Sequence, residues 1–262
     1  MARRTISGCR VLVTGASSGI GAALVQELLE RGARVVALAR RADRLASLAA
    51  GQPTGEHYRW HAGDVTNRAD RAAALELARR EFGGLDALVN NAGIGALGAF
   101  ADADEARLRN VFEVNLFAPA EFIREALPLL RQGNRPIVVN MGSVLGHRAV
   151  PGKSEYCASK FAVHGLSDAL RAEFSREKID LLLVSPSTTA TEFFDVAAAQ
   201  SFAFSPARNP LGSMTPRAVA RRTVAAMAAG RHEIILSASG KMLVWLDRLC
   251  PALAHWFVTR WT

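Results

Sequence analysis

Tyr156 and Lys160, four residues apart, are the pair in this chain whose joint chemistry is easiest to name. Residues four apart lie on the same face of an α-helix, so a phenol and an ammonium group can act together there. An unperturbed tyrosine has a pKa of about 10 and is a poor base at neutral pH. An ammonium group held nearby favours the phenolate and lowers that pKa. The pair could therefore move a proton to or from an alcohol oxygen while a cofactor moves a hydride.

A glycine-rich segment near the start of the chain, Thr14–Gly21, predicts where such a cofactor would bind. It follows an apolar run and precedes a helical pattern, so glycines there let the backbone approach a pyrophosphate at a helix N-terminus. Its spacing is Gly-x-x-x-Gly-x-Gly, not the commoner Gly-x-Gly-x-x-Gly. The structural alternative is a tight strand–helix turn that needs small residues. The residues predicted to contact a dinucleotide are Gly15, Ser17, Ser18, Gly19, Ile20 and Gly21.

Short apolar runs alternate with amphipathic segments along the chain, which predicts strands alternating with helices. The predicted strands are 10–14, 34–39, 57–61, 85–89, 136–140, 180–185 and 233–236. The predicted helices are 19–31, 43–50, 68–82, 105–130, 154–177 and one that starts at Thr215-Pro216, with the threonine as its N-cap. This order indicates one α/β domain over 1–240, with a doubly wound parallel sheet of about seven strands and helices on both faces.

A doubly wound sheet binds its ligands outside the carboxyl ends of its strands. Several of the chain's small and polar residues fall at such ends, which predicts that they build one site. They are the glycine-rich segment, Asp64, Asn90–Gly93, Ser143 and Pro186.

The end of the second predicted strand bears on which dinucleotide is bound. An acidic residue there reads the ribose 2′-hydroxyl of NAD, and an arginine nearby accommodates the 2′-phosphate of NADP. Here Ala39 is followed by Arg40 and Arg41, with no carboxylate before Asp43. Arginine matches phosphate in a planar, bidentate geometry. We therefore expect NADP(H) in preference to NAD(H), with Arg40 as the first and Arg41 as the second contact. The alternative is that both are solvated charges at a helix entry.

Taken together, these motifs resemble those of the short-chain dehydrogenase/reductase family over about residues 8–236. The segment Thr14–Gly21 is similar to the family's Thr-Gly-x-x-x-Gly-x-Gly loop, and Asn90–Gly93 to its Asn-Asn-Ala-Gly motif. Four further residues fall in the order of the family's catalytic tetrad, and they are Asn115, Ser143, Tyr156 and Lys160.

The resemblance implies a role for each of these four residues. Tyr156 would be the general acid in carbonyl reduction and the base in alcohol oxidation, and Ser143 would hydrogen-bond the substrate oxygen. Lys160 would bind the nicotinamide ribose and depress the pKa of Tyr156. Asn115 would hold a helix distortion whose carbonyl positions a water in a proton relay.

The resemblance also implies further cofactor contacts. Asp64 and Val65 would line the adenine pocket, and Asn91, with Ala92 and Gly93, would pack behind the cofactor. After the sixth strand the family usually reads Pro-Gly, whereas this chain reads Pro186-Ser187, which would carry strain if the position needs a positive φ. Thr191 holds the position of a threonine that contacts the nicotinamide carboxamide.

Three residues near the tetrad have simpler explanations than catalysis. Cys157 follows Tyr156 but lies on another face of the helix, so we expect it to pack in the core. His147 and His164 could touch substrate, but we favour local polar contacts within the protein.

Composition excludes several classes of function. The 262 residues are 50% hydrophobic with a formal charge of +8, but the arginines are scattered, so no nucleic-acid partner is expected. Attraction to phosphorylated cofactors or anionic lipids stays open. The widely spaced cysteines make neither a metal site nor a disulfide framework and suit a reducing compartment. With no secretory signal and no apolar run long enough to span a bilayer, we expect a cytoplasmic protein.

Two segments beyond the common motifs are rich in apolar residues. The predicted substrate loop, 188–214, carries Phe193, Phe194, Phe202 and Phe204, which either indicate a hydrophobic substrate or pack onto the core or a partner subunit. The extension 241–262 holds three of the four tryptophans together with lysine and arginine, and Pro251 interrupts any helix there. It could pack on protein, over the cleft or at a subunit contact, or rest on a membrane as a peripheral contact.

The function best predicted by the sequence is an NADP(H)-dependent oxidoreductase that acts on a carbonyl or secondary alcohol of a hydrophobic small molecule. We expect a homodimer or homotetramer. Two alternatives are a non-catalytic dinucleotide sensor on the same fold and a lipid-binding protein at a membrane surface. An intact Ser143, Tyr156 and Lys160 argues against both, because neither function needs a proton relay.

Overall fold

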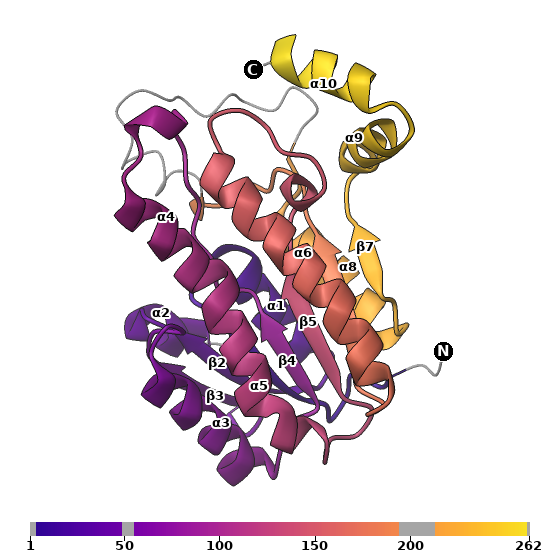
Figure 1. The fold of residues 1–262 in the computed structure, drawn as a ribbon. Coiled ribbons are helices and arrows are strands. Elements are labelled where there is room, and N and C mark those ends of the chain that lie inside the picture. Colours follow the sequence, from indigo (N-terminus) through magenta and orange to yellow (C-terminus); the bar gives the residue numbers. More distant parts are fainter. Residues whose placement is uncertain (1–3, 49–54, 194–212, 261–262) are drawn as a thin grey trace.

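A parallel β-sheet of seven strands forms the middle layer of the protein (Figure 1). The structure, a computed structural model, describes residues 4–48, 55–193 and 213–260. The strands lie in the order β3-β2-β1-β4-β5-β6-β7. Their bounds are β1 Arg10–Thr14, β2 Arg34–Ala39, β3 Tyr58–Ala62, β4 Ala87–Asn90, β5 Ile137–Met141, β6 Asp180–Ser185 and β7 Glu233–Ile235.

The strand order reverses between β1 and β4, which is where a doubly wound sheet opens a crevice. The chain starts in the centre with β1, moves outward through β2 to β3, and returns to place β4 on the other side of β1. Val13 of β1 is paired with Ala37 of β2 on one side and with Val89 of β4 on the other. The loops that follow β1 and β4 therefore emerge side by side.

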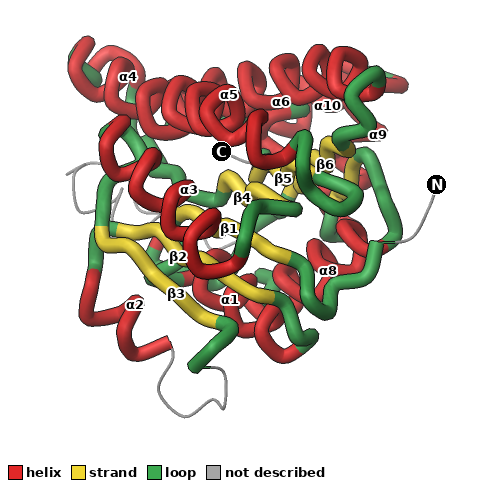
Figure 2. The backbone as a smooth tube through the Cα atoms, turned by 90° about the horizontal axis from the view of Figure 1, so that it is seen from below, coloured by secondary structure: helices red, strands yellow, loops and turns green. Residues whose placement is uncertain are grey.

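Helices cover both faces of the sheet, as Figure 2 shows in the view along it. One face packs against α1 (Gly19–Glu30), α2 (Ala42–Leu48) and α8 (Pro216–Ala228). The other packs against α3 (Arg68–Phe82), α5 (Ala118–Leu130) and α6 (Ser154–Ser175). Because both faces are covered, the central strands are apolar on both sides, and Leu12 and Val13 are each 0% exposed. The predicted fold class is confirmed.

The predicted long helix 105–130 is divided in the structure. It consists of α4 (Glu105–Phe112), a π-helical turn η2 (Glu113–Phe117) and α5. Strand and helix ends otherwise differ from prediction by one or two residues, and the predicted N-cap is confirmed, since the Thr215 side chain accepts from the Ala218 N–H at 3.2 Å.

The end of the chain differs from prediction in its secondary structure. Two helices, α9 (Ala238–Leu249) and α10 (Pro251–Arg260), follow β7 and are separated by Cys250. Pro251 does interrupt the helix, but it then begins α10, where a first-turn proline loses no hydrogen bond. Helix α9 also spans the predicted domain boundary at residue 240. None of the helices in the described part of the chain is both long and apolar enough to cross a bilayer.

Candidate active site

The glycine-rich loop between β1 and α1 is packed so tightly that side chains are excluded. A Cβ at Gly15, whose φ is +62°, would lie 2.8 Å from the Ala92 Cα. A Cβ at Gly21 would lie 2.1 Å from the Gly15 carbonyl oxygen. Neither position therefore accepts even alanine without a shift of backbone. This closeness is what brings the loop against the residues that follow β4.

Thr14 and Asn91 hold that contact together. The Thr14 Oγ1 accepts hydrogen bonds from the Asn91 N–H at 3.0 Å and the Ala92 N–H at 2.9 Å. The Asn91 Nδ2 donates to the Thr14 carbonyl oxygen at 2.9 Å and to the Gly15 carbonyl oxygen at 3.2 Å. Asn91 thus supports the loop through its backbone, and its place behind the cofactor stays a prediction.

The N-terminus of α1 is arranged to receive an anion. Ser18 is the N-cap of α1, but its side chain makes no capping hydrogen bond. The first turn of α1, all of which the structure describes, holds no acidic residue. The first backbone N–H groups of α1 are thus left to a ligand, and the helix dipole favours negative charge there. Together with the close glycine packing, this end of α1 fits the pyrophosphate of a dinucleotide.

An arginine from the end of β2 is bound to this loop. Arg41 Nη2 donates to the Ser18 Oγ at 2.6 Å, and Arg41 Nε donates to the Ser17 Oγ at 3.2 Å. Arg41 also lies 3.4 Å from Glu192, which forms an ion pair with Arg44 as well. Arg40, the residue before Arg41, is exposed. The loop thus has a guanidinium group in contact with its two serines.

Tyr156 and Ser143 meet at the carboxyl edge of the sheet. Ser143 follows β5, and its Oγ accepts from the Leu145 N–H at 3.1 Å, which fixes the side chain at the start of a short 3-10 turn, η3 (Val144–Gly146). Tyr156 lies in the first turn of α6 and is 6% exposed. Burial raises the pKa of Tyr156 to about 12, and its hydrogen bond with Ser143 opposes the rise.

Burial has the largest effect on the pKa of Tyr156 in this arrangement, and a lowering of that pKa by Lys160 stays a prediction. The Lys160 Nζ donates to the Met141 carbonyl oxygen at 2.7 Å and lies 5.8 Å from the centroid of the Tyr156 ring. The ammonium group is thus directed to the backbone of β5. Burial also lowers the pKa of Lys160 to about 8, because a low-dielectric surrounding disfavours its charge. Desolvation is thus the largest cause of the pKa shift of both Tyr156 and Lys160.

Asn115 occupies the π-helical turn and links it to the loop after β4. Its Oδ1 accepts from the Ile94 N–H at 2.8 Å, while its Nδ2 donates to the Ile94 carbonyl oxygen at 3.0 Å and to the Ser159 Oγ at 3.0 Å. The side chain is 2% exposed. π-Helical turns occur often at functional sites. The helix distortion that the resemblance implies at Asn115 is therefore confirmed.

Gly93 lies between Asn115 and Lys160. A Cβ at this position would be 3.1 Å from the Asn115 Oδ1 and 3.8 Å from the Lys160 Nζ. The predicted tetrad is therefore contiguous, from Asn115 past Gly93 to Lys160, Tyr156 and Ser143. Sequence reasoning had not singled out Ser159 or Glu192, because only the fold brings them to Asn115 and to the arginines.

The remaining predicted cofactor residues lie around the same crevice. Asp64 begins the turn after β3, and its carboxylate accepts from the N–H and the hydroxyl of Thr66 at 2.9 and 2.8 Å. Val65 beside it is buried. The Pro186 carbonyl oxygen accepts from the Val144 N–H at 2.9 Å, which joins the end of β6 to the turn that follows Ser143.

Thr191 reaches across the crevice to the glycine-rich loop. A Cβ at Gly19 would lie 3.1 Å from the Thr191 Cγ2. The strain considered for Ser187 is absent, since Arg135 and Lys178 are the only non-glycine residues with positive φ in the described ranges. A serine therefore fits this position.

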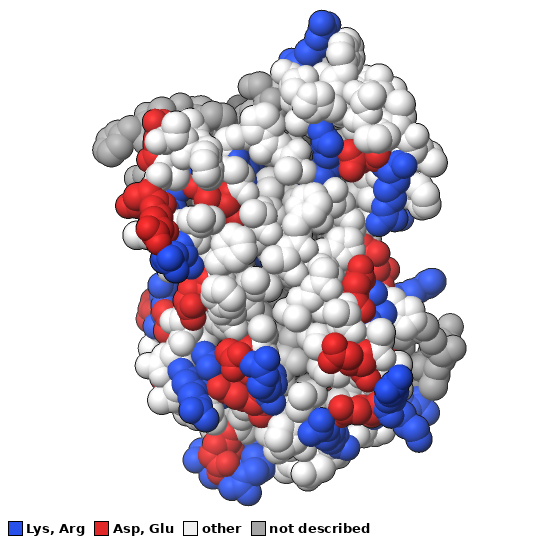
Figure 3. All heavy atoms as spheres, viewed as in Figure 1, with Lys and Arg blue, Asp and Glu red and all other residues white. Residues whose placement is uncertain are grey.

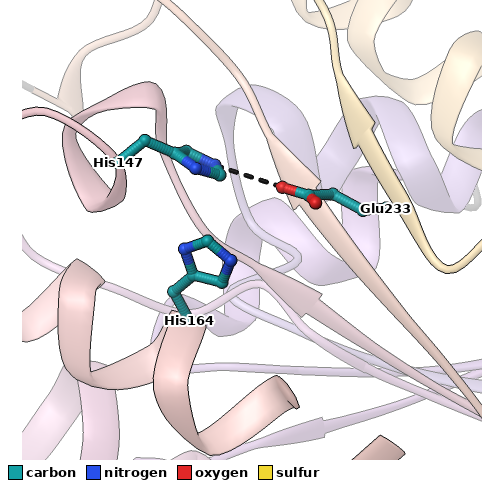
Figure 4. Close-up of side chains that lie close together, drawn as sticks. All are labelled: His147, His164 and Glu233. Atoms are coloured by element: carbon teal, nitrogen blue, oxygen red, sulfur yellow. Dashed lines mark ion pairs between the residues drawn. The ribbon is translucent and has the colours of Figure 1, made fainter. Parts of the chain in front are cut away.

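His147 and His164 make local contacts near this site, as expected (Figure 4). The His147 Nε2 lies 3.0 Å from the Ser185 Oγ and 3.2 Å from the Glu233 Oε1, and the two imidazole centroids are 4.4 Å apart. Burial lowers the pKa of His147 to about 4, so this imidazole is neutral at physiological pH. Cys157 is buried, as predicted for a packing residue.

The two ends of the predicted substrate loop are joined beside the site. Ala190 N–H donates to the Met214 carbonyl oxygen, and Met214 N–H to the Thr188 carbonyl oxygen, both at 3.0 Å. The Phe193 ring packs edge-on against Tyr156, with centroids 5.7 Å apart. Phe194, Phe202 and Phe204 lie outside the described residues.

A cavity of about 450 Å³ opens next to these loop ends. Its walls are formed by the segment after β6, the far end of the loop and the first turns of α9. The lining residues are Ser187, Ser213, Met214, Ser237, Ala238, Ser239 and Met242. Such a volume accommodates a small organic molecule.

Comparison with known proteins agrees with this geometry. A family profile described as short chain dehydrogenase matches residues 10–201. The ketoacyl reductase HetN from Nostoc sp. is 31% identical over 234 residues, which is 89% of this chain and 80% of that protein.

Two solved structures share the whole fold. A short chain dehydrogenase from Burkholderia cenocepacia in complex with NADP has a TM-score of 0.82 and 27% identity, covering 97% of this chain and 99% of that one. A short chain dehydrogenase/reductase from Burkholderia phymatum in complex with NAD has a TM-score of 0.84 and 26% identity, covering 95% and 96%. Matching in profile and in fold, the chain belongs to the short-chain dehydrogenase/reductase family.

Proposed function

We propose that this protein is an NADP(H)-dependent oxidoreductase that acts on a carbonyl or secondary alcohol of a hydrophobic substrate, with Tyr156 as the general acid or base. The observation that carries the proposal is Tyr156 itself. It is a buried phenol, hydrogen-bonded to Ser143 at the crevice of a dinucleotide-binding sheet and one helical turn from Lys160. A binding protein without catalysis has no use for such a proton donor.

At neutral pH Tyr156 is in the protonated form that carbonyl reduction requires. When bound, the nicotinamide supplies or accepts the hydride. With a pKa of about 12, Tyr156 keeps its proton at neutral pH and can donate it to a carbonyl oxygen held by Ser143. The reverse reaction needs the phenolate, which burial disfavours. The proton would be replaced from Lys160 and from a water positioned by the Asn115 carbonyl, since both residues border a small cavity between β4, β5 and α6.

Preference for NADP(H) is supported by the charges around the glycine-rich loop. Arg41 bonds to Ser17 and Ser18, Arg40 is exposed next to it, and no carboxylate follows β2 before Asp43. A guanidinium group pairs well with a 2′-phosphate. The contacts favour Arg41 as the first partner and Arg40 as the second, the reverse of the order expected from sequence. Glu192 would have to release Arg41 for the phosphate to bind.

A hydrophobic substrate is supported by a phenylalanine on Tyr156 and by two methionines in the cavity beside the loop ends. Phe193 packs on the phenol ring, and Met214 and Met242 contribute to the cavity wall. The similar Nostoc protein is named a ketoacyl reductase, so a carbonyl on an acyl chain is a reasonable first class to assay. We propose a cytoplasmic site of action.

Titration of both cofactors against wild-type and variant proteins tests the cofactor assignment. Arg41→Ala should weaken NADPH binding by about ten- to a hundredfold and leave NADH nearly unchanged, because one charged hydrogen bond is worth roughly 1.5–3 kcal/mol. Arg40→Ala should have a smaller effect of the same kind. The matched control is Arg79→Ala, an exposed arginine on α3. Tighter binding of NADH than of NADPH by the wild type would contradict the assignment.

A further inference from the structure

The two C-terminal helices expose an unusual number of large apolar side chains. Eleven large hydrophobic residues are exposed in the described part of the chain, and six of them lie on α9 and α10. They are Met242 (63% exposed), Trp245 (55%), Leu249 (78%), Leu253 (42%), Trp256 (45%) and Phe257 (39%). A contiguous apolar surface of this kind marks an interaction site. We refer to these six residues as the α9–α10 surface.

The helices hold these residues away from the body of the protein. Within α9 only Gly240 and Val244 are buried, and within α10 only Ala254. A hydrogen-bonded ion pair between Arg148 and Asp247, at 2.9 Å, ties α9 to the turn after Ser143. Figure 1 shows α10 at the end of the molecule, beyond the sheet. The surface is therefore anchored to the fold on one side, and on the other side its six side chains are left exposed by the described residues.

The charges on this surface have one sign. Lys241, Arg248 and Arg260 are all exposed, while the sole acidic residue in 238–260, Asp247, is already paired with Arg148. The guanidinium carbon of Arg248 lies 5.8 Å from the centroid of the Trp245 ring, and that of Arg260 lies 4.7 Å from the Trp256 ring. In Figure 3 this end of the molecule is mostly uncharged, with basic atoms at its tip.

Tryptophans, aliphatic side chains and unpaired cations together are the composition of helices that lie in a membrane interface. The core of a protein–protein interface is instead depleted of lysine and of unpaired charge. The described residues around Lys241, Arg248 and Arg260 supply no free counter-charge, whereas acidic lipid headgroups would supply it. We infer that the α9–α10 surface docks the protein on an anionic lipid bilayer, without crossing it.

This docking would place the cavity beside the active site at the lipid surface. Met242 is both a lining residue of the cavity and one of the six exposed residues. Ser187, another lining residue, follows Pro186, whose carbonyl accepts a hydrogen bond from the turn after Ser143. A hydrophobic carbonyl compound dissolved in the bilayer would thus enter next to Tyr156. The docking on lipid does not depend on the proposed function. Only the delivery of substrate from the bilayer rests on the proposed function.

Sedimentation with vesicles tests the docking, using the full chain without cofactor or substrate. The wild type should bind vesicles of phosphatidylcholine with phosphatidylglycerol about tenfold or more tightly than vesicles of phosphatidylcholine alone, and added salt should weaken the binding. Trp245→Ser with Trp256→Ser should abolish it. Trp60→Ser is the matched control, because Trp60 is an exposed tryptophan on β3 and should leave binding unchanged.

A second variant separates charge from apolar contact. Arg248→Glu with Arg260→Glu should lose the preference for the anionic vesicles, while thermal unfolding and NADPH binding show that the fold is intact. The proposal is overturned if the folded wild type fails to bind either vesicle, or if the tryptophan pair can be replaced without loss. A fall in oligomeric mass in the tryptophan variant with no vesicle binding would assign the surface to a second copy instead.

Discussion

Among single side chains, burial determines the electrostatics of this site more than pairing does. Tyr156 and Lys160 were expected to form a close phenol–ammonium pair, and the sequence spacing does place them on one face of α6. Their pKa values nevertheless move in the directions set by desolvation, up for the phenol and down for the ammonium. The phenol therefore keeps its proton at neutral pH, which suits donation of that proton to a carbonyl oxygen, while Lys160 still carries most of its charge.

Lys160 should make the unfolding free energy depend on pH in a recognisable way. Its folded pKa, about 8, lies below its unfolded value, so between about pH 8 and 10 the unfolded chain binds more protons. Stability contributed by this residue therefore rises with pH through that window, by an amount on the order of 3 kcal/mol. Denaturant unfolding of the wild type and of Lys160→Met at several pH values measures it. A difference in unfolding free energy between the two proteins that stays constant from pH 7 to 10 would contradict the lowered pKa of Lys160.

Asn115 illustrates how one side chain fixes an element, since it makes three hydrogen bonds from the π-helical turn, two to Ile94 in the loop after β4 and one to Ser159 on α6. Asn115→Leu removes all three and leaves the Ile94 N–H and carbonyl without this partner, each at a cost of about 1–3 kcal/mol. We expect a loss of about 2–5 kcal/mol in unfolding free energy and a strong loss of turnover. Asn110→Leu is the control, because Asn110 is an exposed asparagine on α4. Equal stabilities of the two variants would show that the π-helical turn does not depend on Asn115.

The elements themselves could largely be predicted from the sequence. Apolar runs such as 10–14 and 180–185 are strands because a sheet covered on both faces demands apolar residues on both sides. The division of 105–130 could not be predicted, since a π-helical turn depends on a tertiary partner, Ile94. The contact of Glu192 with Arg41 depends on the path of the chain after β6, which no local pattern encodes. In the same way, Pro251 could either end the helical structure or begin a second helix. In the structure it begins a second helix, α10.

Considered as a whole molecule, the protein presents apolar surface in a second place besides the α9–α10 surface. Phe117 and Phe161, on η2 and α6, are 53% and 44% exposed. The face that carries α5 and α6 is largely uncharged along its middle (Figure 3). This surface supports the expected homodimer or homotetramer.

Phe117→Glu with Phe161→Glu should therefore lower the mass measured by light scattering, because the introduced charges cannot be buried against a second copy. The corresponding control is Trp60→Glu on the edge strand β3, which should leave the mass unchanged. A wild type that is monomeric at all concentrations would contradict the expected oligomer while leaving the proposed chemistry untouched.

The chemistry itself is tested by comparing the only two tyrosines of the chain. Tyr58 is also buried, and its hydroxyl donates to the Leu45 carbonyl oxygen at 2.9 Å, so Tyr58→Phe removes a phenol hydroxyl of similar burial away from the site. NADPH consumption is followed with a panel of ketones and acyl-chain carbonyls, and NADPH affinity is measured in parallel. Tyr156→Phe should lower kcat by about 10²–10⁴-fold with nearly unchanged NADPH affinity, whereas Tyr58→Phe should keep its turnover. Wild-type turnover by Tyr156→Phe on a substrate that the enzyme reduces would contradict the role of Tyr156.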